Sequence, residues 1–438
     1  MSPSADTAAN GAPSPAARPG TERWYRAVPR DKWFLIGARG ARSLGQGALV
    51  VDFALYLHAL GWDAVSIGAV LAATLIVAAA LTLLVGPASD RLGRKVFILC
   101  FEASQAITAL VALFTSATVP LVAAAVIGGF GRGINGAAGP FAPVEQAWLA
   151  QGLKPELRGR LYSVNAAVGF CGMALGALAA ALPAFFARWL PGPLAYRPLF
   201  LVVFLGSLVC WVLIALTKDY KVEPAASAPE TAPPQSLREE NRLLAALAGI
   251  NAINGLAIGM LGPLMAYWFY IRFHEGPGAI GPMMALALFL TALSALGTGW
   301  LTGRFGVVRA VVWMRFFGLA CLFALPFAPT YGLAATFYVL RSLFNRGTAG
   351  ARQALNISLV RPSRRGLAAS LSSASLQIPR AAGPMLAGLF FDAGFLVAPF
   401  LIAGALQALY IVLFRKSFLA HDPSRVVSGS GPGAASHA

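Results

Sequence analysis

Arginine residues stand inside several long apolar stretches of this chain, where a charged side chain usually faces a cavity or a partner. Arg132, Arg341 and Arg380 fall near the middles of three such stretches. A guanidinium group presents a planar fork of donors that matches a carboxylate or a phosphate, so these residues predict a site for a small anion. The alternative is that each arginine donates to backbone carbonyl groups or helix ends and braces the structure.

Asp52 is the one carboxylate well inside the first long apolar stretch. If that stretch is helical, Asp52 lies within about 80° of Arg42 and about 40° of Tyr56 around the axis, so one broad polar face can hold all three. Burial favours the neutral acid and a neighbouring arginine favours the carboxylate, which is the balance that a proton-coupling group needs. We therefore expect these three residues to bind protons or substrate, with a purely structural pair as the alternative.

Further polar residues suggest helix contacts and a gate. Asn251 and Asn254 are three positions apart and share one helical face, where they either bind substrate or join neighbouring helices. Nearer the ends of their stretches, Glu145 and Arg352 are candidates for an ion pair that opens and closes as the molecule moves. The alternative for this pair is two charges solvated at helix ends.

The composition excludes a soluble globular protein. Of 438 residues, 58% are hydrophobic and 12% are charged, whereas soluble domains carry roughly 25% charged residues. The chain is therefore predicted to be an integral membrane protein with the lipid bilayer as its solvent. The net charge of +17 does not indicate a nucleic-acid partner, because the basic residues punctuate apolar runs. The four cysteines and four histidines lack metal-ligand or paired spacing, so we expect no metal, cofactor or disulfide.

Apolar segments that are near or above the roughly 20 residues needed to cross a bilayer must position these side chains. They are predicted to be helices, because every backbone polar group has to be satisfied inside lipid. The predicted fold class is all-α integral membrane, with twelve transmembrane helices at residues 33–60, 64–88, 96–115, 119–147, 160–187, 197–217, 243–271, 278–301, 307–328, 331–359, 366–391 and 394–414.

Loop charges predict the orientation. If the N-terminus is inside, the inner segments hold 23 Lys or Arg residues and the outer segments hold 3. Positive charge accumulates in cytoplasmic loops, so both termini are predicted to be cytoplasmic and the protein to span the inner (plasma) membrane many times. Residues 1–32 are predicted to be a disordered cytosolic arm and residues 417–438 a disordered tail.

The chain also divides in two. Residues 218–241 are polar and rich in proline, which predicts a cytosolic linker between six-helix bundles at residues 33–217 and 242–416. A weak internal repeat supports this division. Its matching residues are Gly86, Arg91 and Gly93 in the first half and Gly299, Arg304 and Gly306 in the second, at a constant spacing of 213 positions.

One charged stretch carries a family resemblance. Residues 86–95 read Gly-Pro-Ala-Ser-Asp-Arg-Leu-Gly-Arg-Lys, wedged as a tight turn between two spans. The spacing resembles the loop between helices 2 and 3 of the major facilitator superfamily, a large family of secondary transporters. The resemblance implies two bundles that rock around a central cavity, and a latch between them. The latch would involve Gly86, Asp90, Arg91, Gly93 and Arg94.

A second resemblance lies in the fourth predicted span. Residues 132–136 read Arg-Gly-Ile-Asn-Gly and resemble the Arg-x-x-x-Gly motif of many family members, which is often associated with proton coupling. Arg132 and Asn135 therefore join the candidates for substrate or proton binding. The Gly-Pro pair typical of drug-efflux members late in helix 5 is absent here, where the sequence has Gly172 and Gly176 without a proline.

Together these features predict a secondary active transporter that moves a small molecule by alternating access, coupled to protons. The excess of arginine in the spans favours export of an organic anion or amphiphile, with proton-linked uptake of a small carboxylate or phosphorylated metabolite as the alternative. A membrane enzyme or a non-transporting receptor is the alternative from another class. An enzyme is not expected, because no clustered catalytic set is visible. The expected partners are the small-molecule substrate, protons and the bilayer, and the chain is expected to be a monomer.

Overall fold

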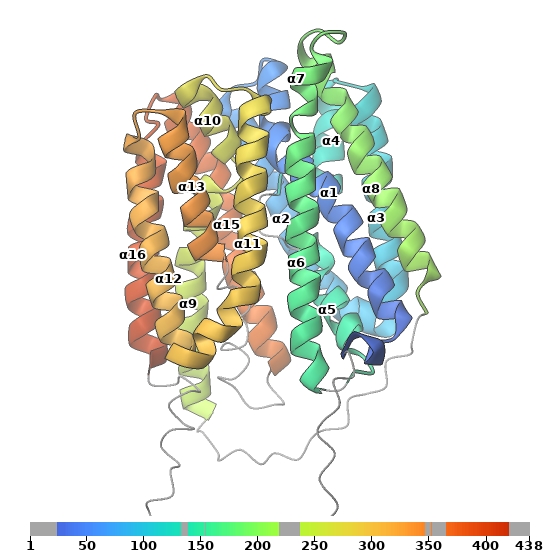
Figure 1. Ribbon diagram of the computed structural model, residues 1–438, viewed down its shortest axis with the longest axis vertical. Helices are drawn as coiled ribbons and strands as arrows, with labels where there is room; N and C mark the ends of the chain where they lie inside the picture. The colour runs from blue at the N-terminus through green and yellow to red at the C-terminus, as the bar shows by residue number, and fades with distance from the viewer. Residues whose placement is uncertain are drawn as a thin grey trace, which may run out of the picture.

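The structure is a computed structural model that describes residues 24–132, 139–153, 155–218, 237–346, 352 and 365–419. These residues form helices and their connections, and no strand occurs among them. The helices run side by side along the long axis of the molecule and form two bundles (Figure 1). We call the end where α1 begins and α16 ends the terminal end, and the opposite end the far end.

The N-terminal bundle contains the helices before residue 219. They are η1 Trp24–Ala27, α1 Arg30–Ala59, α2 Ala64–Leu92, α3 Arg94–Phe114, α4 Thr118–Gly128, η2 Gly139–Phe141, α5 Ala142–Ala150, α6 Pro155–Ala179, α7 Leu182–Phe186, η3 Gly192–Tyr196 and α8 Arg197–Leu216.

The C-terminal bundle contains the remaining described helices. They are α9 Leu237–Leu261, α10 Met265–Phe273, α11 Pro277–Phe305, α12 Val307–Ala324, η4 Leu325–Phe327, α13 Tyr331–Arg346, α15 Arg365–Asp392 and α16 Ala398–Phe418.

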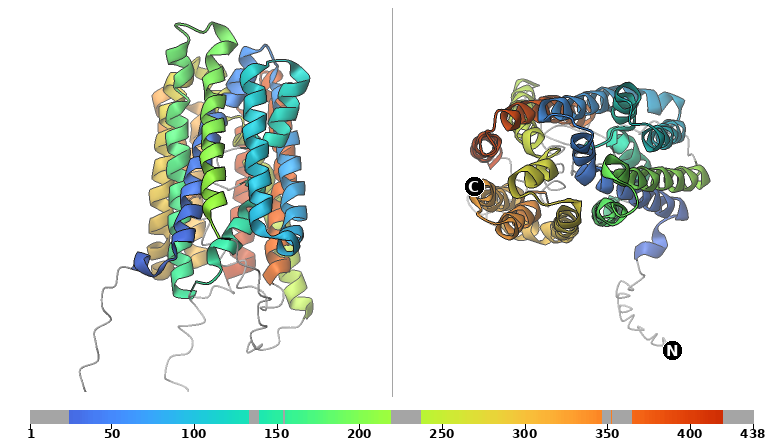
Figure 2. Two further views of the ribbon diagram at one scale, coloured as in Figure 1. Left: turned by 90° about the vertical axis from the view of Figure 1, so that its right-hand side faces the viewer. Right: turned by 90° about the horizontal axis from the view of Figure 1, so that it is seen from above.

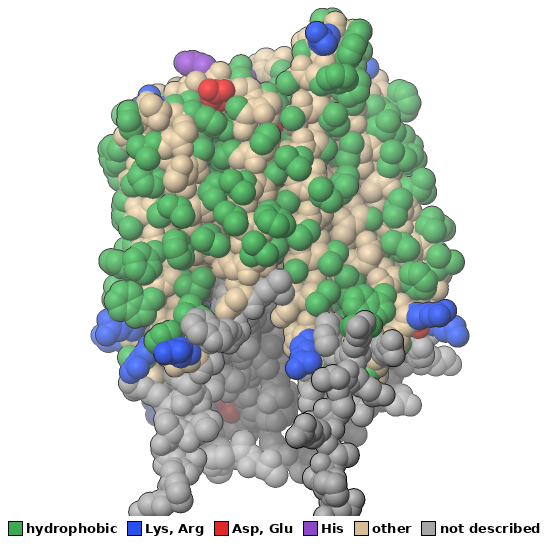
Figure 3. Space-filling model, viewed as in Figure 1, with side chains coloured by type: hydrophobic (Ala, Val, Ile, Leu, Met, Phe, Trp, Pro, Cys, Tyr) green, Lys and Arg blue, Asp and Glu red, His purple; other side chains and the backbone are tan. Residues whose placement is uncertain are grey.

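The twelve-span fold predicted from the sequence is confirmed. Eight segments of the described chain are long and apolar enough to cross a membrane, and they contain α2, α3, α6, α8, α9, α11, α12 and α16. The more polar α1 and α15, the interrupted pair α4 and α5, and α13 complete the set. Large hydrophobic side chains cover the face shown in Figure 3, while Lys and Arg gather mainly at the terminal end, as in a protein that lies in lipid.

Each bundle has its own packing, and two helix pairs make most of the contacts between the bundles. In the N-terminal bundle α1 packs against α6 and α8, and in the C-terminal bundle α9 packs against α15 and α16. Between the bundles, α2 packs against α15 and α6 against α11, as the view from above shows (Figure 2). Glycines permit the close approach: a Cβ at Gly68 would lie 2.5 Å from the Pro384 carbonyl oxygen, and one at Gly281 would lie 2.6 Å from that of Ala177.

Matching contacts show that the two bundles repeat one design. The Thr74 hydroxyl of α2 lies 3.4 Å from the Ala125 carbonyl oxygen of α4, and the Thr291 hydroxyl of α11 lies 3.4 Å from that of Ser342 in α13. Both donors and both acceptors are 217 positions apart. The two bundles therefore repeat this interhelical contact, at a spacing four positions longer than the 213 of the glycine and arginine repeat.

The turn within the charged stretch 86–95 is shorter than expected. Helix α2 continues to Leu92, so the turn consists of Gly93, whose φ is 96°, and α3 begins at Arg94. Gly306, with a φ of 84°, makes the same turn between α11 and α12. A left-handed glycine reverses the chain in one residue, which leaves the preceding charged residues free to remain helical.

The fourth span, expected as one helix over 119–147, is interrupted. Helix α4 ends at Gly128 and α5 begins at Ala142. Gly129, Gly131 and Gly139 have φ values of 70°, 68° and 73°, which right-handed helices do not contain. The sequence shows this run of glycines. The prediction nevertheless gave one continuous helix, because most residues of the segment are apolar.

Domain edges differ slightly from those expected. Helix α9 begins at Leu237, inside the predicted linker 218–241, and α16 extends to Phe418. Residues 1–23, 219–236 and 420–438, which contain most of the predicted arm, linker and tail, lie outside the described residues. The exact domain boundaries stay a prediction.

Candidate functional site

A cavity lies where the N-terminal bundle meets α15. It holds about 60 Å³ of free space, enough for a few water molecules, and it is partly open to solvent. Its polar lining comes from α1, α3, α15 and the segment that follows α4, and no Asp or Glu occurs among the described residues that line it. These polar residues are Arg42, Gln46, Gln105, Arg132, Gln377 and Arg380.

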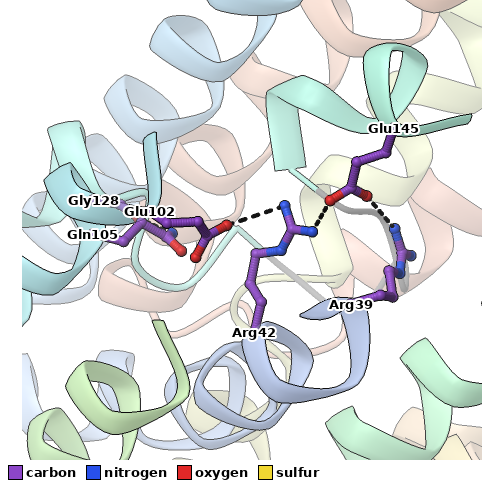
Figure 4. A network of polar contacts seen from close by, with 6 residues as sticks. All are labelled: Arg39, Arg42, Glu102, Gln105, Gly128 and Glu145. Atoms are coloured by element: carbon purple, nitrogen blue, oxygen red, sulfur yellow. Dashed lines mark hydrogen bonds and ion pairs between the residues drawn. The ribbon is translucent and has the colours of Figure 1, made fainter. Parts of the chain in front are cut away.

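A buried ion-pair network forms one edge of the cavity (Figure 4). Arg42 of α1 lies between two carboxylates, with Nη1 3.3 Å from Glu102 Oε1 of α3 and Nη2 bonded to Glu145 Oε1 of α5. Arg39 Nη1 lies 3.5 Å from Glu145 Oε2. Two arginines and two glutamates therefore neutralise one another and tie α1, α3 and α5 together.

The interruption after α4 places Arg132 in the cavity. Gly129 and Gly139 lie against its guanidinium, and a Cβ at Gly129 would overlap that group. The guanidinium carbon lies 5.4 Å from the centre of the Phe101 ring. Gln105 donates a 2.6 Å hydrogen bond to the Gly128 carbonyl oxygen, which satisfies a backbone acceptor at the end of α4.

Arg380 brings the second bundle to the same cavity. Its Nη2 lies 2.5 Å from the Arg132 carbonyl oxygen, so α15 contacts the interruption between α4 and α5 directly. Gln377, one turn earlier on α15, lies 3.4 Å from the Thr82 hydroxyl of α2. Because Arg39 and Arg42 already face the two glutamates, Arg132 and Arg380 give the cavity lining a net positive charge.

Asp52 lies deeper in α1, away from the cavity lining. It is fully buried, and neither carboxyl oxygen has a hydrogen-bond partner among the described residues. Tyr56 follows one turn later and packs against Tyr196 and Phe200, with ring centres 5.9 and 5.3 Å apart. The structure thus keeps Asp52 and Tyr56 together, but Arg42, about 15 Å away along the helix, contacts the two glutamates instead.

The two asparagines of α9 contact helices rather than the cavity lining. Asn251 donates a 3.0 Å hydrogen bond to the Ser372 hydroxyl of α15. Asn254 accepts a 2.8 Å hydrogen bond from Arg315 of α12. Arg341 of α13 is buried in the same bundle and is not among the residues that line the cavity.

The structure describes only some of the predicted gate and latch residues. Gly86 belongs to α2, Gly93 forms the turn and Arg94 begins α3, while the side chains of Asp90 and Arg91 lie outside the described part of the structure, as does all of Asn135. The latch therefore stays a prediction.

The expected Glu145–Arg352 ion pair is not formed among the described contacts. Glu145 faces Arg39 and Arg42, because α5 packs against α1 of its own bundle. Arg352 follows α13 of the C-terminal bundle and forms no ion pair with Glu145 among these contacts.

Sequence reasoning missed part of the site. Glu102, which is fully buried and faces Arg42, is not among the residues that the sequence singled out. Gln46, Gln105 and Gln377 were not selected at all. Their signal was present in the sequence, since each is a polar side chain inside a segment long enough to span the membrane.

Comparison with known proteins shows the family. The family model described as Major Facilitator Superfamily matches residues 35–248 and 247–437. The chain belongs to the major facilitator superfamily. It is therefore a multi-pass membrane transporter of this family, and the family resemblance seen in residues 86–95 is confirmed.

Similar proteins cover almost the whole chain. A protein of Saccharomyces cerevisiae named Uncharacterized membrane protein YJR124C is 23% identical over 434 residues, which is 91% of this chain and 96% of the yeast protein. An auto-inhibited POT family peptide transporter matches 90% of this chain and 97% of its own, with a TM-score of 0.67 and 14% identity.

A bacterial homologue of the iron transporter ferroportin, in an inward-facing state, matches 89% of this chain and 98% of its own, with a TM-score of 0.66 and 17% identity. One of these solved structures is a peptide transporter and the other is a homologue of an iron transporter, so the molecules named for them differ in chemistry. Their similarity therefore establishes the shared fold. The substrate has to be inferred from the residues of the site.

Proposed function

We propose that this transporter moves a small organic anion across the membrane by alternating access, coupled to protons. The observation that carries the proposal is the cavity at the meeting of the bundles, whose lining contains Arg132 and Arg380 and no described carboxylate. Arginine forks bind carboxylate and phosphate groups bidentately, and a buried positive site attracts an anion. Amide groups of Gln46, Gln105 and Gln377 supply further donors for the rest of the substrate.

Contacts at the far end support alternating access. Asp392, at the end of α15, accepts hydrogen bonds from the Ala64 and Val65 backbone N–H groups at the start of α2, at 2.9 and 2.8 Å. This carboxylate meets the positive end of a helix in the other bundle. Opening the far end requires these bonds to break, so we propose that the described state is closed there and that the terminal end faces the cytoplasm, where the basic residues gather.

Asp52 supports proton coupling. Burying a carboxylate without a partner is costly, so this group is suited to remain a neutral acid in the described state and to release its proton when helix movement admits water or a cation. Its position on α1, the helix that also carries Arg42, links that change to the cavity.

Transport into proteoliposomes tests the substrate class. Purified protein is reconstituted, a pH gradient is imposed, and uptake of labelled organic anions is compared with that of organic cations. We expect anion transport that falls at least about tenfold in Arg132→Gln, since a charge-assisted pair is lost, and that is unchanged in Arg188→Gln, an exposed arginine outside the cavity. Transport of cations with anions ignored overturns the proposal.

Proton coupling is tested separately with Asp52→Asn. We expect this variant to exchange anions while losing its response to the pH gradient. Glu275→Gln, which removes a carboxylate between α10 and α11, is the matched control and should respond as the unmodified protein does. An unchanged pH dependence in Asp52→Asn contradicts the coupling role. Running the assay with the gradient in both directions tests the predicted export against uptake.

A further inference from the structure

Glu102 of α3 is a buried carboxylate to which the proposed transport mechanism gives no role. It is 0% exposed. Its ion-pair partner among the described residues is Arg42 of α1, whose Nη1 lies 3.3 Å from Glu102 Oε1 (Figure 4). Neither carboxylate oxygen has a hydrogen-bond partner in the described part of the chain. The guanidinium of Arg42 therefore carries most of the compensation for burying this negative charge.

The other groups that face Glu102 do not replace Arg42. Cys210 of α8 is buried beside it and carries no positive charge. Arg132, on the segment after α4, acts on Glu102 more weakly than Arg42 does and forms no ion pair with it among the described contacts. Glu145 of α5 lies on the other side of Arg42 and is itself negative. If Arg42 turned away, Glu102 would be a buried charge without an ion-pair partner.

Arg42 reaches the cavity and the two glutamates do not. It lines the cavity together with Arg132 and Arg380, whereas neither Glu102 nor Glu145 is among the lining residues. The free space beside it, about 60 Å³, is enough for a few water molecules, which a carboxylate or phosphate group can displace. An anion bound there competes with Glu102 for the guanidinium of Arg42.

Of the two glutamates, Glu102 is the one that loses its partner in this competition. Glu145 is also paired with Arg39, whose Nη1 lies 3.5 Å from Glu145 Oε2, so it stays paired when Arg42 turns toward an anion. Glu102 has no second ion pair among the described residues. A buried carboxylate without a partner avoids the cost of its charge by binding a proton.

The internal repeat shows that packing does not require a carboxylate at this contact. Glu102 of α3 and Arg315 of α12 are 213 positions apart, and their partners Arg42 and Asn254 are 212 positions apart on α1 and α9. In the C-terminal bundle Arg315 donates a 2.8 Å hydrogen bond to the neutral Asn254. The same interhelical contact is thus made there without a group that can bind a proton.

We propose that Glu102 is a second proton-binding site, which takes up one proton from water when an anion in the cavity draws Arg42 away. The proton bonds to a carboxylate oxygen of Glu102, and the negative charge of the anion takes the place of Glu102 beside Arg42. This inference rests on the proposed anion transport and deepens it. It assigns one proton to the binding of the anion, whereas Asp52 responds to the movement of the helices.

The pH dependence of anion binding tests the site. Oxalate, which stays fully ionised near neutral pH, is titrated calorimetrically into the purified full-length protein. Because one proton is bound with each anion, the affinity of the unmodified protein should fall by up to about tenfold for each unit rise in pH. Glu102→Gln should bind oxalate without this pH dependence, since an amide takes up no proton. Glu275→Gln, which removes a carboxylate between α10 and α11, is the control and should keep it.

A second measurement needs no anion. Arg42→Gln removes the partner of Glu102 permanently, so its infrared spectrum should show one more neutral carboxylic-acid band than that of the unmodified protein. The band should disappear when Glu102→Gln is added to Arg42→Gln. Arg39→Gln is the matched control, because it leaves Arg42 between the two glutamates and should show no additional band. If Arg42→Gln folds poorly, the pH dependence of Glu102→Gln still decides.

The results separate this site from anion transport. Oxalate binding that is independent of pH in the unmodified protein, or that keeps its full pH dependence in Glu102→Gln, refutes the proton site and leaves anion transport standing. A spectrum of Arg42→Gln without an additional band refutes the proton site as well. Absence of binding of both oxalate and inorganic phosphate overturns anion transport and, with it, the trigger assigned to Glu102.

Discussion

The two bundles share one arrangement of interhelical contacts and differ in the charges that fill it. In the N-terminal bundle, Arg42 of α1 lies between Glu102 and Glu145, so the charges at this contact offset one another. In the C-terminal bundle, the matching contact is the hydrogen bond from Arg315 to Asn254, which holds no carboxylate. Repetition of a backbone design therefore does not require repetition of its electrostatics.

The first helix of each bundle differs as well. Helix α1 is continuous from Arg30 to Ala59, whereas the equivalent span is divided into α9 and α10 after Leu261. Gly262 and Pro263 occupy the break, and proline removes a backbone donor from the helix. The two bundles therefore differ in the continuity of their first span as well as in the charges at the matching contact.

The largest expected effect separates the two arginines at the matching contacts. Arg42→Met leaves two buried glutamates with less positive charge to offset them, and should destabilise the protein by about 3–5 kcal/mol. Arg315→Met leaves a neutral asparagine amide and should cost about 1–3 kcal/mol. Unfolding temperatures of the two purified variants, heated under identical conditions without added anion, measure the difference. Equal losses would show that the bundles are electrostatically alike.

The next effect concerns the glycines of the interrupted fourth span. Gly129→Ala forces a left-handed residue to carry a Cβ that overlaps the Arg132 guanidinium, which should cost about 1–3 kcal/mol and displace that arginine from the cavity. The matched control is Gly249→Ala in α9, where a Cβ meets nothing within 4 Å. The control should be neutral or about 0.5–1 kcal/mol more stable. Unfolding and anion transport are both measured, and an active, stable Gly129→Ala contradicts the assigned role of the interruption.

A smaller effect is expected where the bundles meet at the far end. Asp392→Asn removes the charge that faces the start of α2, and should weaken the closed state by about 1 kcal/mol, or roughly fivefold in its population. A cysteine introduced at the cavity position Leu49, with the native cysteines replaced, reports the change through faster labelling from the far side. Glu275→Gln is the control carboxylate. Unchanged labelling would show that Asp392 does not hold the bundles closed.

The smallest effect belongs to the N-cap of α2, which acts within one bundle. Hydrogen bonds from Ser66 lower the pKa of Asp63 below its usual value. The folded-state pKa is the lower one, so the stabilisation is present above the unfolded-state pKa of about 3.9 and is lost as pH falls through the folded value. Asp63→Ala should therefore lower the unfolding temperature slightly near neutral pH, and the difference from the unmodified protein should shrink in acid. A difference that grows in acid contradicts this reasoning.

The sequence by itself determined the spans and their number. Apolar runs of membrane length have no other stable arrangement in lipid than helices, so predicted and observed helices agree at most ends. The glycine turn at Gly93 and its copy at Gly306 were also readable, because a left-handed position strongly favours glycine. Of the three mid-span arginines that the sequence singled out, Arg132 and Arg380 line the cavity and Arg341 does not, and their role in binding stays a prediction.

The tertiary structure alone decided which polar groups meet. Hydropathy gives the approximate depth of Glu145 and Asn254 in the membrane. Their partners depend on how α5 packs on α1 and how α12 packs on α9. Residues separated by about 60 to 100 positions form these contacts, and several arginines at similar depth compete for each acceptor. Local sequence patterns do not predict which arginine pairs with which acceptor. The pairing depends on the distances between helices and on how far each ion pair offsets the free-energy cost of desolvation.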